Sequence, residues 1–100
     1  MIIVTEAGRA RLEEADNLTG FKLLAHGSRE DRAAVGVALA DAGRIEGDVA
    51  WIEVSWLLSQ AGARSAEWCE SFAGMVAFAK SRGWCDDAGS AIRAHIEWAD

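Results

Sequence analysis

The distribution of apolar residues along the chain predicts helices over most of its length. The clearest helix begins at about Ser65, a residue suited to an N-cap, and continues to Arg82. Gly83 follows and is placed to end it. Its apolar residues recur at helical spacing and share one face: Trp68, Cys69, Phe72, Met75, Val76 and Ala79. Phe78 projects from another side of the same helix and needs separate cover.

Three other segments have weaker helical periodicity and suitable caps. We expect a short helix over about 6–16 and a second over about 29–42, where Ser28 and Asp31 have the spacing of a capping pair. A last helix over about 86–98 would place these residues inward: Ala88, Ile92, His95, Ile96 and Ala99. The segments between these helices are short, which is typical of a bundle.

The segment over about 48–61 carries two apolar stripes when it is read as a helix. The broad stripe consists of Trp51, Val54, Leu57, Leu58 and Ala61, and the second consists of Val49, Ile52 and Trp56. A helix with two apolar stripes lies at the centre of a bundle or is docked to a partner on its second side. Either arrangement requires a second apolar surface.

Two short apolar runs interrupt the helical pattern. Residues 1–4 and 21–25 read as strands or extended segments, and they leave open a small hairpin between them. We find no internal repeat and no linker. The sequence therefore predicts one domain over residues 1–100 with an all-α fold, a compact bundle of four to five helices with a short N-terminal strand or hairpin as an option.

Composition supports helices and raises one question about the surface. The chain has no proline but five tryptophans, more large rings than the interior of a small bundle holds, so we expect Trp56 or Trp98 at the surface or at a subunit contact. Exposed aromatic groups usually mark contact surfaces. We therefore expect an interface formed by these residues: Val49, Ile52, Trp56 and Phe78.

The charge balance limits the classes of partner. Ten basic against sixteen acidic residues give a net charge of −6, which opposes binding to nucleic acid. The longest apolar run, 72–79, is too short to cross a bilayer, and the first residues lack the layout of a signal peptide. We expect a cytoplasmic protein that does not bind membranes. In that compartment Cys69 and Cys85, the only cysteines, are expected to be free thiols.

A few side chains are candidates for chemistry. If the last two helices pack antiparallel, Cys69 and His95 would meet as a nucleophilic pair or as half of a metal site. Glu53 beside Trp56 would serve as a base if it is desolvated. No ligand spacing of a known metal site is present, so we expect neither metal nor cofactor. Whether the protein is an enzyme stays open at this point.

The residues from Leu23 to Ala34 are similar to the strand-turn-helix opening of the sirohydrochlorin chelatase family, in which the histidine serves metal insertion. That family's repeated strand-helix units do not follow here, so the similarity is local. A physical expectation remains at the same place. The free amides of a helix start, together with His26, Ser28 and Arg29, would hold a small anion.

Two functions follow from these observations. The first is a small acidic helical protein that acts through protein-protein contacts, as a homodimer or as an accessory or regulatory partner of a larger protein. The alternative is a small-molecule binder or cofactor-free enzyme with a tryptophan-lined pocket between helices.

Overall fold

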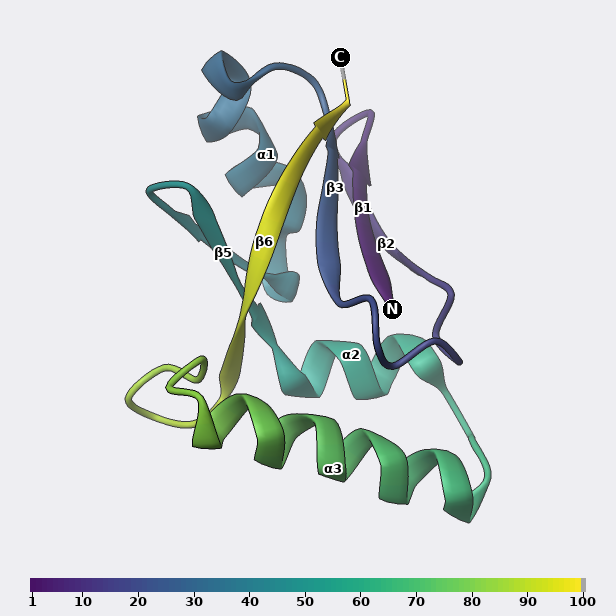
Figure 1. Ribbon diagram of the computed structural model, residues 1–100. Helices are drawn as coiled ribbons and strands as arrows, with labels where there is room; N and C mark the ends of the chain where they lie inside the picture. The colour runs from purple at the N-terminus through teal and green to yellow at the C-terminus, as the bar shows by residue number, and fades with distance from the viewer. Residues whose placement is uncertain (100) are drawn as a thin grey trace.

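A six-stranded mixed sheet, not a helical bundle, forms the centre of the molecule. The computed structural model describes residues 1–99, and its strand order is β2-β1-β3-β6-β5-β4 (Figure 1). The strands are β1 (Ile2–Glu6), β2 (Arg9–Glu13), β3 (Lys22–His26), β4 (Gly43–Glu46), β5 (Val49–Glu53) and β6 (Ala91–Ala99). The all-α prediction was therefore wrong.

Three α-helices accompany the sheet in the described residues. They are α1 (Arg32–Leu39), α2 (Val54–Ala61) and α3 (Ala66–Ser81), and the short 3₁₀ turns η1 (Arg29–Asp31) and η2 (Ala40–Ala42) flank α1. The helix predicted after Ser65 is confirmed, since the Ser65 side chain accepts a hydrogen bond from the Trp68 amide. None of these helices is both long and apolar enough for a bilayer crossing within residues 1–99.

The first predicted helix is instead the hairpin of β1 and β2. Ala7 and Gly8 connect the strands with φ values of 53° and 76°, the conformation that a tight hairpin turn needs and that glycine adopts without steric penalty. The strands expected near residues 1–4 and 21–25 are present, but they pair in parallel rather than as a hairpin. The antiparallel partner of β1 is β2.

The segment read as a two-stripe helix divides into a strand and a helix. Residues 43–53 form the hairpin of β4 and β5 around Gly47 and Asp48, and only residues 54–61 are helical. A two-residue connection beginning with glycine between apolar runs is a hairpin signal that helical periodicity obscured. Val49 and Ile52 therefore lie on opposite faces of a strand, and the second stripe does not exist.

The last predicted helix is instead strand β6, which lies between β3 and β5 inside the sheet. It pairs in parallel with β3 and antiparallel with β5. Ile92, Ala94 and Ile96 are buried, while Arg93 and His95 between them are exposed. This alternation has the period of a strand with one covered face.

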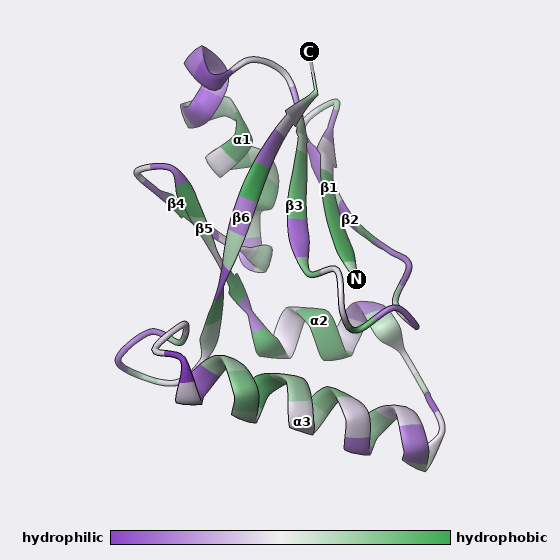
Figure 2. Ribbon diagram, viewed as in Figure 1, coloured by the Kyte–Doolittle hydropathy of each residue, from purple (hydrophilic) through white to green (hydrophobic). Residues whose placement is uncertain are grey.

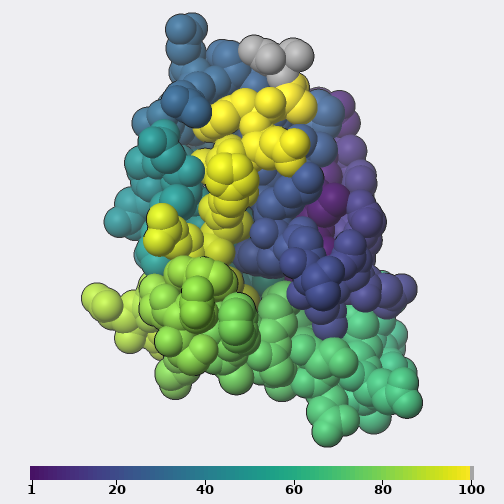
Figure 3. Space-filling model, viewed as in Figure 1, coloured from purple at the N-terminus to yellow at the C-terminus, as the bar shows by residue number. Residues whose placement is uncertain are grey.

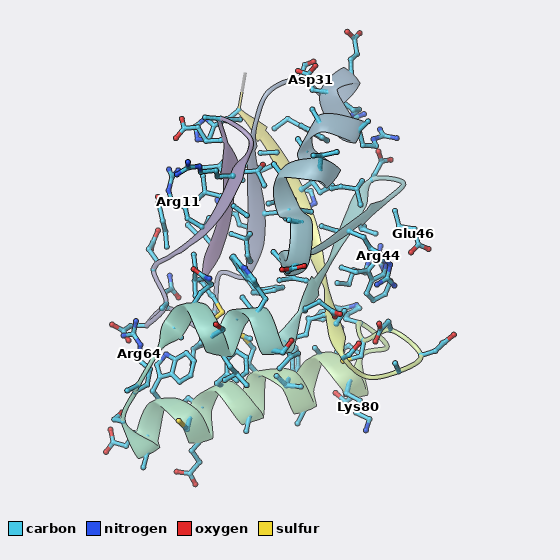
Figure 4. The ribbon with its side chains drawn as sticks, turned by 180° about the vertical axis from the view of Figure 1, so that it is seen from behind. Arg11, Asp31, Arg44, Glu46, Arg64 and Lys80 are labelled. Carbon is cyan, nitrogen blue, oxygen red and sulfur yellow. The ribbon has the colours of Figure 1, made fainter. Side chains whose placement is uncertain are left out.

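Helices α1 and α2 cover one face of the sheet and leave the other open, and α3 lies across one end of the sheet (Figure 1). The buried cluster unites inward strand residues, among them Leu23, Ile52 and Ile96, with Leu39 of α1 and Leu57 of α2. Figure 4, viewed from behind, shows α1 in front of the strands, whereas Figure 1 looks onto β3 and β6 with no helix in front of them. We call this uncovered side the outer face.

Candidate functional site

The outer face carries the candidate site at the end of the sheet nearest α3. Two adjoining hollows of about 370 and 190 Å³ lie there, and both are lined by Phe21, Trp84 and Arg93. Val49 and His95 complete the larger hollow, and Phe78 and Met75 help to line the smaller one. We call this continuous depression the aromatic groove and define it by five residues: Phe21, Phe78, Trp84, Arg93 and His95.

Segments far apart in the sequence build the groove. Phe21 precedes β3, Phe78 lies in the last turns of α3, Trp84 follows that helix, and Arg93 and His95 project from β6. In Figure 3 the end of α3 and the loop after it stand out beside the strand β6, which is drawn in yellow. Figure 2 shows that β6 is apolar next to α3 and that polar and apolar segments alternate further along the strand.

The aromatic rings of the groove are held by each other and by a cation. Phe78 and Trp84 meet edge to face, with ring centroids 5.8 Å apart and planes at 74°. The Arg82 guanidinium carbon lies 5.8 Å from the Phe78 centroid and 5.5 Å from the Trp84 centroid. The rings nevertheless stay accessible, because Phe78 is 57% exposed and Trp84 is 37% exposed.

Backbone hydrogen bonds fix Trp84 between α3 and β6. Its amide donates to the Ala79 carbonyl at 2.8 Å, and its carbonyl accepts from the Arg93 amide at 2.7 Å. The groove therefore has a rigid wall although Trp84 lies outside regular structure. Rigid aromatic groups bind with a small loss of conformational entropy.

Asp86 closes the loop that follows Trp84. Its carboxylate accepts hydrogen bonds from the Ser90 amide at 2.9 Å and the Ala91 amide at 3.2 Å. Burial alone would raise its pKa, but these hydrogen bonds and the nearby Arg44 guanidinium together hold the pKa of Asp86 below its ordinary value of 3.8. The charged carboxylate is thus part of what shapes the loop.

The groove has positive groups that are free to bind an anion. Half of the ten lysines and arginines make no ion pair within residues 1–99: Arg9, Arg29, Lys80, Arg82 and Arg93. Arg93 belongs to the groove, Arg82 lies against the rings of Phe78 and Trp84, and Lys80 lies at the same end of α3 (Figure 4). In a chain of net charge −6, these three cations gather near one end of α3, where the following loop also carries the carboxylates of Asp86 and Asp87.

The structure separates the residues that we considered for catalysis. Cys69 is exposed on the first turn of α3, and it is not among the residues that line the hollow beside His95. Glu53 ends β5 and lines another hollow of about 290 Å³ with Asp41 and Arg44. One of its carboxylate oxygens is buried without a hydrogen-bond partner in the described part of the chain. The predicted pairing of Cys69 with His95 therefore has no geometric support, and Glu53 lines a different hollow from His95.

The predicted anion site lies at the end of β3. His26 Nδ1 is 3.8 Å from a Glu6 carboxylate oxygen, and Arg29 begins η1 with its side chain exposed. The Ser28 amide and hydroxyl both donate to the Asp31 carboxylate, at 3.1 and 3.3 Å. Because a carboxylate of the chain itself takes these donors, an external anion would have to displace it.

The predicted interface residues have dissimilar environments. Ile52 is fully buried in the core, so it is not available to another chain. Val49 is half-buried beside the groove, and Phe78 is in the groove. Trp56 is half-buried in a separate shallow hollow of about 630 Å³ between α2 and the β1–β2 hairpin. Trp84, rather than Trp56 or Trp98, is the exposed tryptophan.

Sequence reasoning missed three groove residues, namely Phe21, Trp84 and Arg93. The signal that was present is the alternation along β6, which places Arg93 and His95 on one side and Ile92 and Ala94 on the other. Nothing local connects these positions with Phe21. No three His, Cys, Asp or Glu side chains of residues 1–99 gather as a metal ion would require.

No protein family matches this chain, and neither a curated protein nor a solved structure is significantly similar to it. The candidate site is therefore assigned from its geometry and charge alone.

Proposed function

We propose that the protein is a binding module that holds a segment of a partner protein in the aromatic groove. The observation that carries this proposal is an exposed aromatic pair, Phe78 and Trp84, beside the cations Arg82 and Arg93, which make no ion pair within residues 1–99. Tryptophan and arginine are enriched among the residues that dominate binding at protein interfaces. The protein-contact hypothesis from the sequence is thereby kept, but at another surface.

The groove favours a segment in which an apolar side chain stands next to a carboxylate. Covering the exposed parts of Phe78 and Trp84 removes about 200 Å² of apolar surface, or about 5 kcal/mol before the losses of association are subtracted. A carboxylate of the partner would accept from the Arg93 guanidinium, which offers a planar set of donors.

A different protein fits this groove better than a second copy of the chain. In a symmetric dimer through this face the same surface lies on both sides of the contact, and the residues that line the groove include a cation but no carboxylate. Arg82 and Arg93 would then find no opposite charge in the groove of the second copy, which disfavours the contact. Light scattering at micromolar concentration checks this. A dimer that dissociates when Arg93→Glu is introduced would show that the groove binds a second copy of the chain and not a different protein.

The experiment is selection from a displayed library of random peptides of about a dozen residues, followed by titration of the selected peptides. We expect enrichment of peptides that combine Asp or Glu with an aromatic or aliphatic residue. Arg93→Glu should weaken their binding at least about tenfold. The matched control is Arg29→Glu, since Arg29 is also exposed and unpaired within residues 1–99 but lies on η1. Equal effects of both variants, or selected peptides without acidic residues, would overturn the proposal.

A second function, binding of a small aromatic carboxylate, is favoured by one observation. The larger hollow holds about 370 Å³ and offers Trp84, Arg93 and His95 together, within the size range of ligand pockets. Titration with phenylpropionate, followed by the His95 ring resonances, tests it. Saturable shifts that Arg93→Gln abolishes, in the absence of any selected peptide, would favour this function over the first.

A further inference from the structure

A second pocket lies at the other end of the parallel strands, away from the aromatic groove. It has a volume of about 200 Å³, and its polar lining residues are Thr5, Glu6, His26 and Asp31. The strands β1 and β3 are parallel and both end here. After β1 the chain turns back into β2, whereas after β3 it continues through η1 into α1 on the covered face. Such a divergence at the carboxyl ends of parallel strands is where sheets of this kind open a crevice for ligands.

Thr5 is the unusual residue of this pocket. It is 2% exposed and is the buried polar residue of the core, yet its hydroxyl has no hydrogen-bond partner within residues 1–99. Buried polar groups are nearly always hydrogen-bonded, and an unsatisfied one destabilises a fold. A valine would fit the same strand position without this disadvantage. The hydroxyl therefore points to a ligand.

The two carboxylates of the pocket favour a positively charged ligand. Asp31 uses one carboxylate oxygen, Oδ2, for both hydrogen bonds from Ser28, and its Oδ1 has no partner in the described chain. Glu6 pairs with Arg11 through Oε1 at 3.1 Å, while its Oε2 lies 3.8 Å from His26. Three residues with acceptor groups thus line one pocket, and two of them are carboxylates.

We propose that this pocket binds a small primary ammonium compound. An ammonium group has three N–H donors and no acceptor, which matches the Thr5 hydroxyl, Asp31 Oδ1 and Glu6 Oε2, the last of which lies 3.8 Å from His26. The apolar lining residues suit a short hydrocarbon body: Ala34, Val35 and Ala38. A volume of about 200 Å³ accommodates a body of roughly benzene size, since cavities of about 150 Å³ hold benzene. The site is independent of the aromatic groove and of the function proposed for it.

The test is titration with propylammonium, followed through the backbone amide resonances of residues 5–8, 26 and 31. Tetramethylammonium, which has the charge but no N–H donor, and propionate, which has the opposite charge, serve as matched probes. We expect saturable shifts with propylammonium alone, at millimolar concentration, as suits a ligand of a few atoms.

Two substitutions at one position separate the hydroxyl from the shape of the side chain. Thr5→Val should weaken propylammonium binding by about tenfold or more while the protein unfolds at an equal or higher temperature, and Thr5→Ser should bind within about threefold of the wild type. Thr19→Val, in the loop before β3, is the control for an exposed threonine. Glu6→Gln tests the charge separately, because that side chain is 47% exposed and its substitution leaves the core intact. Equal binding of tetramethylammonium, unchanged binding by Thr5→Val, or the absence of saturable shifts would overturn the proposal.

Discussion

At the scale of single residues, Asp86 connects the charge of a side chain to the shape of the groove. Its carboxylate accepts from two backbone amides of the loop between Trp84 and β6. Because its pKa is lower in the folded protein than in the unfolded chain, the charged form stabilises the fold. This stabilisation is complete above the ordinary pKa of 3.8 and is lost as the pH falls through the lower folded value.

We therefore expect Asp86→Asn to lower the melting temperature at pH 7. The difference in melting temperature from the wild type should become smaller below about pH 4. Melting curves of the two proteins between pH 2 and pH 7, at about one-unit steps, measure the difference. Asp87→Asn changes the same charge one residue later without these hydrogen bonds within residues 1–99, and it should match the wild type throughout. A pH-independent gap for Asp86→Asn would contradict the role given to its charge.

Two glycines allow opposite predictions from the same substitution. A Cβ at Gly43 would lie 2.0 Å from the Trp51 carbonyl oxygen, so Gly43→Ala must force β4 and β5 apart. Gly74 lies within α3 with no atom near its Cβ position, so alanine there only adds helix propensity. Chemical unfolding should show a loss of about 3 kcal/mol or more for Gly43→Ala and a gain of about 0.5–1 kcal/mol for Gly74→Ala. Similar values for both would contradict the close contact of these strands.

At the scale of elements, α3 has an anchoring aromatic residue and an accessible one. Phe72 is 4% exposed and stacks on Trp68 with ring centroids 5.1 Å apart, whereas Phe78 is 57% exposed. We expect Phe72→Ala to destabilise the protein by about 3–5 kcal/mol and Phe78→Ala by about 1 kcal/mol or less. Binding of the selected peptides should show the reverse order in any folded variant. A large loss of stability from Phe78→Ala would mean that this ring supports the fold and not a partner.

The sequence allowed α3 to be predicted, but not β6. In α3 the cap, the apolar face and the terminating glycine all indicate one helix, and the structure agrees within a residue at each end. In β6 the inward residues Ile92 and Ile96 are spaced by four, which suits a helix and a strand equally. Residues 91–99 form a strand because they pair with β3 and β5, which are about seventy and forty residues away along the chain. Such pairing leaves no local pattern.

The site was predictable to the same limited extent. Phe78 attracted attention because it did not fit the apolar face of its helix, and His95 because of its chemistry. Phe21, Trp84 and Arg93 join them only after β6 has been inserted between β3 and β5, so a helical reading of residues 86–98 excluded the groove. An error in one element thus removed a whole surface.

At the scale of the whole molecule, the net charge and the groove have opposite signs. The chain carries −6 over a body with principal extents of 39 × 26 × 20 Å, while Arg93 in the groove and Arg82 against its rings are both positively charged. In about 0.01 M salt the screening length of about 30 Å lets the entire charge act on an approaching acidic peptide. In about 0.1 M salt the screening length is about 10 Å, so an approaching peptide interacts only with the charges of the groove when it is close to them.

For an acidic partner we therefore expect salt to affect the two rate constants in a specific way. The association rate constant should rise by about threefold between about 0.01 and 0.1 M salt, because screening removes the long-range repulsion. The dissociation rate constant should rise as well, because the contact between the Arg93 guanidinium and the partner's carboxylate is weakened. Stopped-flow tryptophan fluorescence with a peptide from the library selection measures both, and Arg93→Gln should remove most of the salt dependence of dissociation alone. An association rate that falls with salt would show attraction by the whole molecule, which identifies a basic partner and contradicts the acidic segment proposed for the groove.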